Sequence, residues 1–318
     1  MRKAALETFA SAILLLAVNP ASSAAASGFR KVSPHFYYLE SKTGAANTGA
    51  VITVDGILLI DPPPEPEIPA MLNALKAVTA RAVRWVVSTD YQQAKIAGLA
   101  TFLKQGVAIV GSKELDRLAG STIVLEPNQP APLVPERPNP RFLFGQQLHL
   151  YPAGIEVRIL AVKSKARTAG DVVVFLPSEK VLAVGDFFAP SSFPVIDSGP
   201  GEGSARGWID GLKQVIEAVP LLKSAMPPPK QETPVPQEPE KTLEETVAVI
   251  PSHGGPANLQ QMKALLTAAQ KLRTEANKAI AAGRAADEFV KSLPGDVFGE
   301  YGNLAVFAGQ LFDELSKK

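Results

Sequence analysis

Residues 83–98, with the sequence VRWVVSTDYQQAKIAG, restrict the possible folds more than any other stretch of this chain. The first five residues of the stretch are rich in valine and include a tryptophan, which predicts a short β-strand. Apolar residues at helical spacing begin at Ile96, so a helix is expected there. Residues 88–95 are therefore predicted to form a loop that leads from the strand into the helix. In α/β folds such loops carry side chains to the carboxyl edge of a sheet, where ligand sites collect.

The composition bounds both the size of the fold and the chemistry open to it. A chain of 318 residues with 46% hydrophobic and 20% charged residues has enough apolar side chains for one large globular domain. With 32 basic and 31 acidic residues it is nearly neutral, which argues against nucleic acid and an anionic membrane surface as partners. Cysteine is absent, so thiolate catalysis, cysteine-bound zinc and disulfides are excluded. Three histidines, His35, His149 and His253, are too few to hold two zinc ions mainly through imidazole.

The N-terminus has the pattern of an export signal. Arg2 and Lys3 precede an apolar run over residues 9–18, and small residues lead to Ala26. We expect residues 1–26 to form a signal peptide and the mature protein to be periplasmic or secreted. An apolar run of about ten residues is too short to cross a bilayer core of about 30 Å as a helix, so no stable membrane anchor is expected.

A β-hairpin is expected near the start of the mature chain. Two short apolar runs, at residues 50–54 and 57–60, flank Asp55-Gly56. Asp-Gly between such runs is typical of a two-residue hairpin turn in which both residues have positive φ. The second run ends at Asp61, and the three prolines that follow cannot continue a strand.

Three short polar motifs follow in the second half of the chain. Residues 166–171 read Ala-Arg-Thr-Ala-Gly-Asp and precede a valine-rich strand. Residues 181–186 read Val-Leu-Ala-Val-Gly-Asp, a buried strand that ends in a carboxylate. Residues 251–254 read Pro-Ser-His-Gly and follow another short strand. Each motif places a charged or imidazole side chain beside a strand, and Gly170-Asp171 is expected to form a turn with a local carboxylate hydrogen bond.

Two proline-rich segments and a helical C-terminus complete the organisation. Residues 126–140 are expected to form an irregular surface loop. Residues 227–240 hold six prolines and are expected to form a solvated, polyproline-like insert rather than a domain boundary. Residues 257–318 carry three helical patterns, which are expected to cover the outer face of the second sheet of the fold.

In this order and spacing, the motifs resemble those of the metallo-β-lactamase superfamily. The shared features are the opening hairpin, the strand and loop at 83–98, the Thr-X-Gly-Asp turn, the Gly-Asp strand end and the final His-Gly loop. The resemblance implies an α/β fold over residues 27–318, a four-layer αββα sandwich in which two mixed sheets lie face to face between helices. It also implies a site at one edge of the sheets.

The metal-binding motif of that superfamily is degenerate in this chain. Aligned on the His-X-His-X-Asp-His signature, the loop carries other residues at all four ligand positions: Asp90, Gln92, Ala94 and Lys95. Arg167 stands at a further histidine position. Asp186, at the position of the metal-bridging carboxylate, and His253 are the two that match. The resemblance thus implies a pocket formed by seven positions, five of which no longer carry the usual ligand.

Two of the changes place positive charge where the superfamily holds metal ions. Arginine does not deprotonate in proteins, and a lysine adds a second fixed cation. Asp90 and Asp186 balance Lys95 and Arg167, so the four together are neutral. Our hypothesis is that the two cations stand in for the two lost metal ions. The competing interpretation is that the loops have moved apart and the four side chains do not meet.

These residues support three hypotheses on function. The first is an exported protein that has lost metal binding and hydrolase activity, has no cofactor, and acts in a binding or structural role, for example toward a partner protein. The alternative is a hydrolase for ester, thioester or lactam substrates with one divalent metal such as zinc on Asp90, Asp186 and His253. The third is recognition of an anionic small molecule by Lys95 and Arg167. A Lys95 ammonium in contact with Asp186 favours the first hypothesis over the second.

Overall fold

The structure is a computed structural model, and it describes residues 28–115, 117, 142–219 and 246–317. The expected signal peptide and the proline-rich segments at 126–140 and 227–240 lie outside the described residues. Within the described ranges, no helix is long and apolar enough to cross a membrane.

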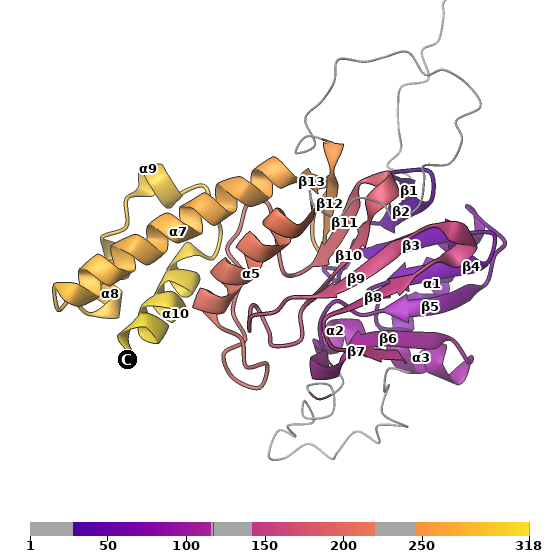
Figure 1. The fold of residues 1–318 in the computed structure, drawn as a ribbon, viewed down its shortest axis with the longest axis horizontal. Coiled ribbons are helices and arrows are strands. Elements are labelled where there is room, and N and C mark those ends of the chain that lie inside the picture. The colour runs from indigo at the N-terminus through magenta and orange to yellow at the C-terminus, as the bar shows by residue number, and fades with distance from the viewer. Residues whose placement is uncertain (1–27, 116, 118–141, 220–245, 318) are drawn as a thin grey trace, which may run out of the picture.

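The strands and α-helices are labelled in Figure 1. The strands are β1 (Arg30–Lys31), β2 (Phe36–Leu39), β3 (Thr48–Thr53), β4 (Gly56–Ile60), β5 (Val83–Val87), β6 (Ala108–Ser112), β7 (Phe142–Phe144), β8 (Gln147–Leu150), β9 (Val157–Ala161), β10 (Val172–Leu176), β11 (Val181–Gly185), β12 (Ala248–Pro251) and β13 (Ala257–Asn258). The helices are α1 (Ile68–Lys76), α2 (Gln93–Ile96), α3 (Leu99–Lys104), α5 (Ala205–Ala218), α7 (Leu259–Ala281), α8 (Ala286–Lys291), α9 (Gly295–Phe298) and α10 (Leu304–Ser316).

The strands form two mixed sheets. The first has seven strands in the order β1 to β7, antiparallel from β1 to β4 and parallel from β4 to β7. The second has six strands in the order β13-β12-β11-β10-β9-β8, and β11 and β12 are its parallel pair. The chain crosses from the first sheet to the second between β7 and β8, so each half of the sequence builds one sheet.

The two sheets pack face to face through one apolar cluster. Leu58 and Val87 enter it from the first sheet, and Val174 and Ala183 enter it from the second. The central strands β4 and β10 are buried on both faces, which is why each reads as an unbroken apolar run. Each fully buried aliphatic side chain contributes about 1.5–3 kcal/mol to this packing.

Helices cover the outer face of each sheet. On the first sheet, α1 and α3 bury Met71 and Phe102 against Leu59 and Ile109. On the second, α5 and α7 bury apolar side chains against Leu182 and neighbouring strand residues. The fold is therefore a four-layer αββα sandwich, which confirms the prediction from the sequence.

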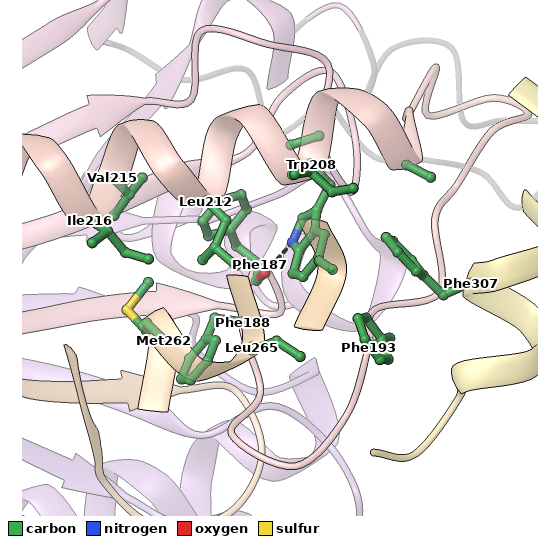
Figure 2. Packing of buried hydrophobic residues seen from close by; sticks show 14 of the residues in the cluster. Phe187, Phe188, Phe193, Trp208, Leu212, Val215, Ile216, Met262, Leu265 and Phe307 are labelled. Atoms are coloured by element: carbon green, nitrogen blue, oxygen red, sulfur yellow. Dashed lines mark hydrogen bonds between the residues drawn. The ribbon is translucent and has the colours of Figure 1, made fainter. Parts of the chain in front are cut away.

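The C-terminal helices extend the layer that covers the second sheet. Figure 2 shows Trp208 of α5 at the centre of this packing, with Phe193 and Phe307 beside it. Its indole N–H donates to the Phe187 carbonyl at 2.8 Å, so the ring is fixed in orientation. α10 packs against α5, α7 and α8. The sequence predicts that these helices cover the sheet, whereas in Figure 1 the outer end of α7, with α8 and α10, reaches beyond the strands.

The hairpin expected at Asp55-Gly56 is present, but its turn lies one residue earlier. Gly56 pairs with Thr53, so Val54 and Asp55 form the turn. Of these residues only Gly56 has positive φ, at 133°. A Cβ atom on Gly56 would lie 2.4 Å from Arg84 Cγ. The prediction of positive φ for both Asp55 and Gly56 is therefore wrong, and the glycine is required by its own conformation and by the approach of β5.

Candidate functional site

The loop after β5 lies at the carboxyl edge of the first sheet. Because β4 and β5 are parallel neighbours, Asp61 and residues 88–92 leave the sheet side by side. The Thr89 N–H donates to Asp61 Oδ1 at 2.7 Å, and the Thr89 hydroxyl donates to Asp61 Oδ2 at 2.6 Å. The Gln92 N–H donates to Asp90 Oδ1 at 2.9 Å. These bonds hold the Asp61 and Asp90 carboxylates in place before any cation is considered.

The second sheet brings its polar motifs to the same edge. Asp186 directly follows β11, and His253 lies in the loop after β12, the parallel neighbour of β11. The Ser252 N–H donates to the Gly185 carbonyl at 2.9 Å, which joins the two loops. Asn47, just ahead of β3, donates its own N–H to the Ser252 carbonyl at 2.7 Å and so ties this loop to the first sheet.

The ammonium of Lys95 lies at the centre of the edge. Its Nζ is 2.9 Å from Asp90 Oδ2, 3.2 Å from Asp186 Oδ2 and 3.3 Å from Asp61 Oδ2. It also donates to the Thr89 hydroxyl oxygen at 2.8 Å. The side chain is 1% exposed, so these oxygens replace the water that an ammonium ordinarily binds. α2 positions this lysine, since it begins immediately after the loop and turns the side chain back over it.

A second cation and an imidazole complete the cluster. Arg167 Nη1 lies 3.3 Å from Asp90 Oδ2, and Arg167 Nη2 lies 4.0 Å from Asp186 Oδ2. His253 Nε2 lies 3.2 Å from Asp186 Oδ1. Arg167 is 12% exposed and His253 is 56% exposed, so the cluster opens to solvent on the side of the histidine.

The structure thus brings together five of the seven predicted positions: Asp90, Lys95, Arg167, Asp186 and His253. The interpretation that the loops have moved apart is wrong. Gln92 contributes a backbone N–H to Asp90. Ala94 lies within α2. We define the charge cluster as those five residues together with Asp61.

Asp61 is the member that the sequence did not reveal. It has φ of 51°, a left-handed conformation that is uncommon for a residue other than glycine. A strained backbone conformation of this kind persists only where the surrounding contacts hold the residue firmly, as the two hydrogen bonds from Thr89 do here. The predicted balance of two carboxylates and two cations is therefore incomplete. Three carboxylates surround Lys95, and two of them, Asp90 and Asp186, also face Arg167. The formal charge of the cluster reaches zero when His253 is protonated.

Gly185 is required by the close approach of the two sheets. Its φ is +57°, and a Cβ atom there would lie 2.0 Å from Thr89 Oγ1 and 3.0 Å from Lys95 Nζ. Any side chain would push the loop after β5 away from β11. The Gly-Asp strand end is thus explained by geometry, because glycine lets Asp186 reach the ammonium.

The proton affinities in the cluster follow from burial and charge. Burial alone disfavours a charged lysine, but the three carboxylates raise the pKa of Lys95 above its usual range. Burial likewise opposes ionisation of Asp186, yet Lys95, His253 and Arg167 together hold its pKa well below the ordinary value. Burial raises the pKa of Asp61 despite the neighbouring Lys95. The hydrogen bond to Asp186 raises the pKa of His253.

The donor set does not fit a metal ion. Within the described ranges, no group of three or more His, Asp or Glu side chains is arranged to hold one. All four oxygens of Asp90 and Asp186 already accept from, or pair with, Lys95, Arg167, His253 or a backbone N–H. A void of about 10 Å³ adjoins Asp61 and Gly185, enough for at most one water molecule.

Asp171 lies beside the cluster and is predicted as a turn residue. Its carboxylate accepts from the Thr168 N–H at 2.7 Å and from the Thr168 hydroxyl at 2.9 Å, which confirms the local hydrogen bond. Burial raises the pKa of Asp171 to about 7. The hydrogen bonds from Thr168 and the charge of Arg167 oppose that shift, and the charge of Asp90 adds to it.

Solved structures share this fold, although no protein-family model and no curated protein matches the sequence. A metallo-β-lactamase from Pontibacter korlensis aligns with a TM-score of 0.56 and 19% identity, over 76% of this chain and 98% of its own. The inverting sec-alkylsulfatase Pisa1 from Pseudomonas sp. aligns with a TM-score of 0.68 and 15% identity, over 91% of this chain and 50% of its own. This chain therefore spans half the length of that sulfatase. Together the likenesses show the metallo-β-lactamase fold, as the motif order predicts.

Replacing Lys95 with methionine is expected to destabilise the protein strongly. The Lys95→Met substitution keeps the apolar stem but leaves the buried Asp61 and Asp90 and the partly buried Asp186 without the ammonium. We expect a loss of about 3–5 kcal/mol in the free energy of unfolding. Urea unfolding at neutral pH measures it. Lys291→Met, an exposed lysine of α8 that pairs with Asp287, is the matched control and should change stability by less than about 0.5 kcal/mol. Equal stability of the two variants would contradict the central role of Lys95.

Replacing Asp171 with asparagine is expected to flatten the pH dependence of stability. A folded-state pKa of about 7 against the ordinary 3.8 means that the folded protein binds the proton more tightly, so stability falls as pH rises through that interval. Asp171→Asn still accepts from the Thr168 N–H but does not titrate. Between pH of about 4 and 7, the free energy of unfolding of the wild-type protein should fall by up to about 4 kcal/mol more than that of the variant. Urea unfolding over this pH range measures the difference. Parallel curves would show that Asp171 is ionised throughout.

Proposed function

We propose that this chain is an exported protein of the metallo-β-lactamase fold that has lost metal binding and hydrolase activity and acts in a binding or structural role. The observation that carries the proposal is the position of the Lys95 ammonium, within 3.3 Å of three carboxylates. In this proposal the ammonium and the Arg167 guanidinium supply the positive charge that metal ions supply in other members of the fold.

Electrostatics supports the proposal. A divalent cation that entered the cluster would meet two fixed charges of its own sign. At about 4 Å and an effective dielectric constant near 20, two unit charges interact by about 4 kcal/mol, and the repulsion of a divalent ion is larger. The carboxylates would have to release Lys95 or Arg167 before they could bind the ion. Those released cations would then be buried without partners, which is itself costly.

The two other hypotheses receive less support. A single metal on Asp90, Asp186 and His253 requires carboxylate oxygens that now bind Lys95 and Arg167, and His253 Nε2 faces Asp186. Recognition of an anion by Lys95 and Arg167 requires both cations to be accessible. Lys95 is 1% exposed and is surrounded by carboxylates, which would repel an anion.

The purified protein is expected to contain well under one equivalent of zinc, iron or manganese and to leave nitrocefin, thioesters and phosphodiesters unhydrolysed. Elemental mass spectrometry after expression in zinc-supplemented medium measures the metal content per chain. The double substitution Lys95→His with Arg167→His removes the repulsion and should raise the number of metal ions bound per chain. The matched control, Lys31→His with Lys291→His, adds two imidazoles at exposed positions and should not. One firmly bound metal in the unmutated protein, with hydrolysis that His253→Ala abolishes, would favour the single-metal hydrolase instead.

Export is tested separately from the chemistry of the site. The basic residues, apolar run and small residues at the N-terminus support it. N-terminal sequencing of the protein from its native host is expected to begin at or near Ser27. Recovery of intact Met1 on a protein in the cytoplasm would remove the claim of export and leave the proposal for the charge cluster standing.

A further inference from the structure

A groove separate from the charge cluster lies between the end of α7 and α8. In Figure 1 this end of the helical layer points away from the seven-stranded sheet. The groove has a volume of about 330 Å³, within the range of small-ligand sites. The residues that matter for its chemistry are Glu275, Lys278, Ala279, Arg284, Phe289 and Leu293.

The floor of the groove is apolar and held in place by packing. Phe289 is 2% exposed and stacks on Phe312 of α10, with ring centroids 5.4 Å apart. Ala279 belongs to the same buried apolar cluster as Phe289 and Phe312, and Leu293 packs against that cluster. The floor is therefore supported from behind by α10 and keeps its shape without an occupant.

The wall of the groove carries a net positive charge. Lys278 Nζ lies 2.9 Å from Glu275 Oε1, so these two side chains balance each other. Arg284 is exposed and has no ion-pair partner in the part of the chain that the structure describes. One guanidinium, with a planar set of donors that matches a carboxylate, is thus left open beside an apolar surface.

We propose that this groove binds a small amphiphilic monocarboxylate. Its carboxylate would pair with Arg284, and its hydrocarbon part would lie over Phe289 and Leu293. The charge balance favours a monoanion, because Lys278 and Glu275 neutralise each other and Arg284 leaves one positive charge to be matched. The apolar floor favours a hydrocarbon tail over a wholly polar anion. This inference is independent of the function proposed for the charge cluster.

Hexanoate is the probe for the test, titrated into the purified chain and followed through the backbone amide resonances. Saturable shifts confined to the end of α7 and to α8 are expected. Arg284→Gln should weaken the affinity by at least about fivefold. Lys291→Gln, on the same helix as Phe289 but outside the groove lining, is the matched control and should bind as the unmutated protein does.

Three outcomes would overturn the proposal. The first is the absence of saturable shifts up to about 20 mM hexanoate. A Kd above that concentration corresponds to a binding free energy weaker than about 2 kcal/mol, which is too weak for specific recognition. The second is unchanged affinity in Arg284→Gln, which would place hexanoate elsewhere. The third is inorganic phosphate bound as tightly as hexanoate, which would mean that the groove selects charge alone and not an amphiphile.

Discussion

The buried ammonium of Lys95 is the constraint on which the geometry of the candidate site depends. A charge removed from water costs several kcal/mol unless nearby groups match it, and here Thr89 and three carboxylates do so. Each of those groups must be held at hydrogen-bonding distance by its own backbone. The absent side chain of Gly185 and the left-handed conformation of Asp61 both satisfy that requirement. Features that are far apart in the sequence thus have one physical cause.

Much of the fold could be predicted because its strands are strongly patterned. The continuous apolar runs of β4 and β10 are typical of strands buried on both faces, and the structure has them there. The sequence predicts the turn between β3 and β4 one residue later than the structure has it. Asp55-Gly56 satisfies the local rule for a hairpin, but the pairing of Gly56 with Thr53 and the contact with Arg84 depend on strands that local sequence does not reveal.

The candidate site was predictable where it follows a linear motif and not where it follows the register of the sheet. Asp90 and Lys95 lie in one short loop, so their proximity follows from sequence spacing. Asp61 belongs to a different loop, and an aspartate between a strand and three prolines is equally typical of a turn. Its place beside Lys95 depends on β4 and β5 being parallel neighbours that end together. This pairing of strands is a long-range contact, and the local sequence around Asp61 does not specify it.

The charge cluster also joins the two sheets. Asp61, Asp90 and Lys95 follow strands of the first sheet, whereas Arg167 precedes β10 and Asp186 follows β11 of the second. Where a dissolved ion links two parts of a protein, the strength of the link varies with the concentration of that ion. Here every linking group is covalently part of the chain, so the link between the two sheets forms in an intramolecular step. Neither dilution nor a chelator can take any of these side chains away from the edge.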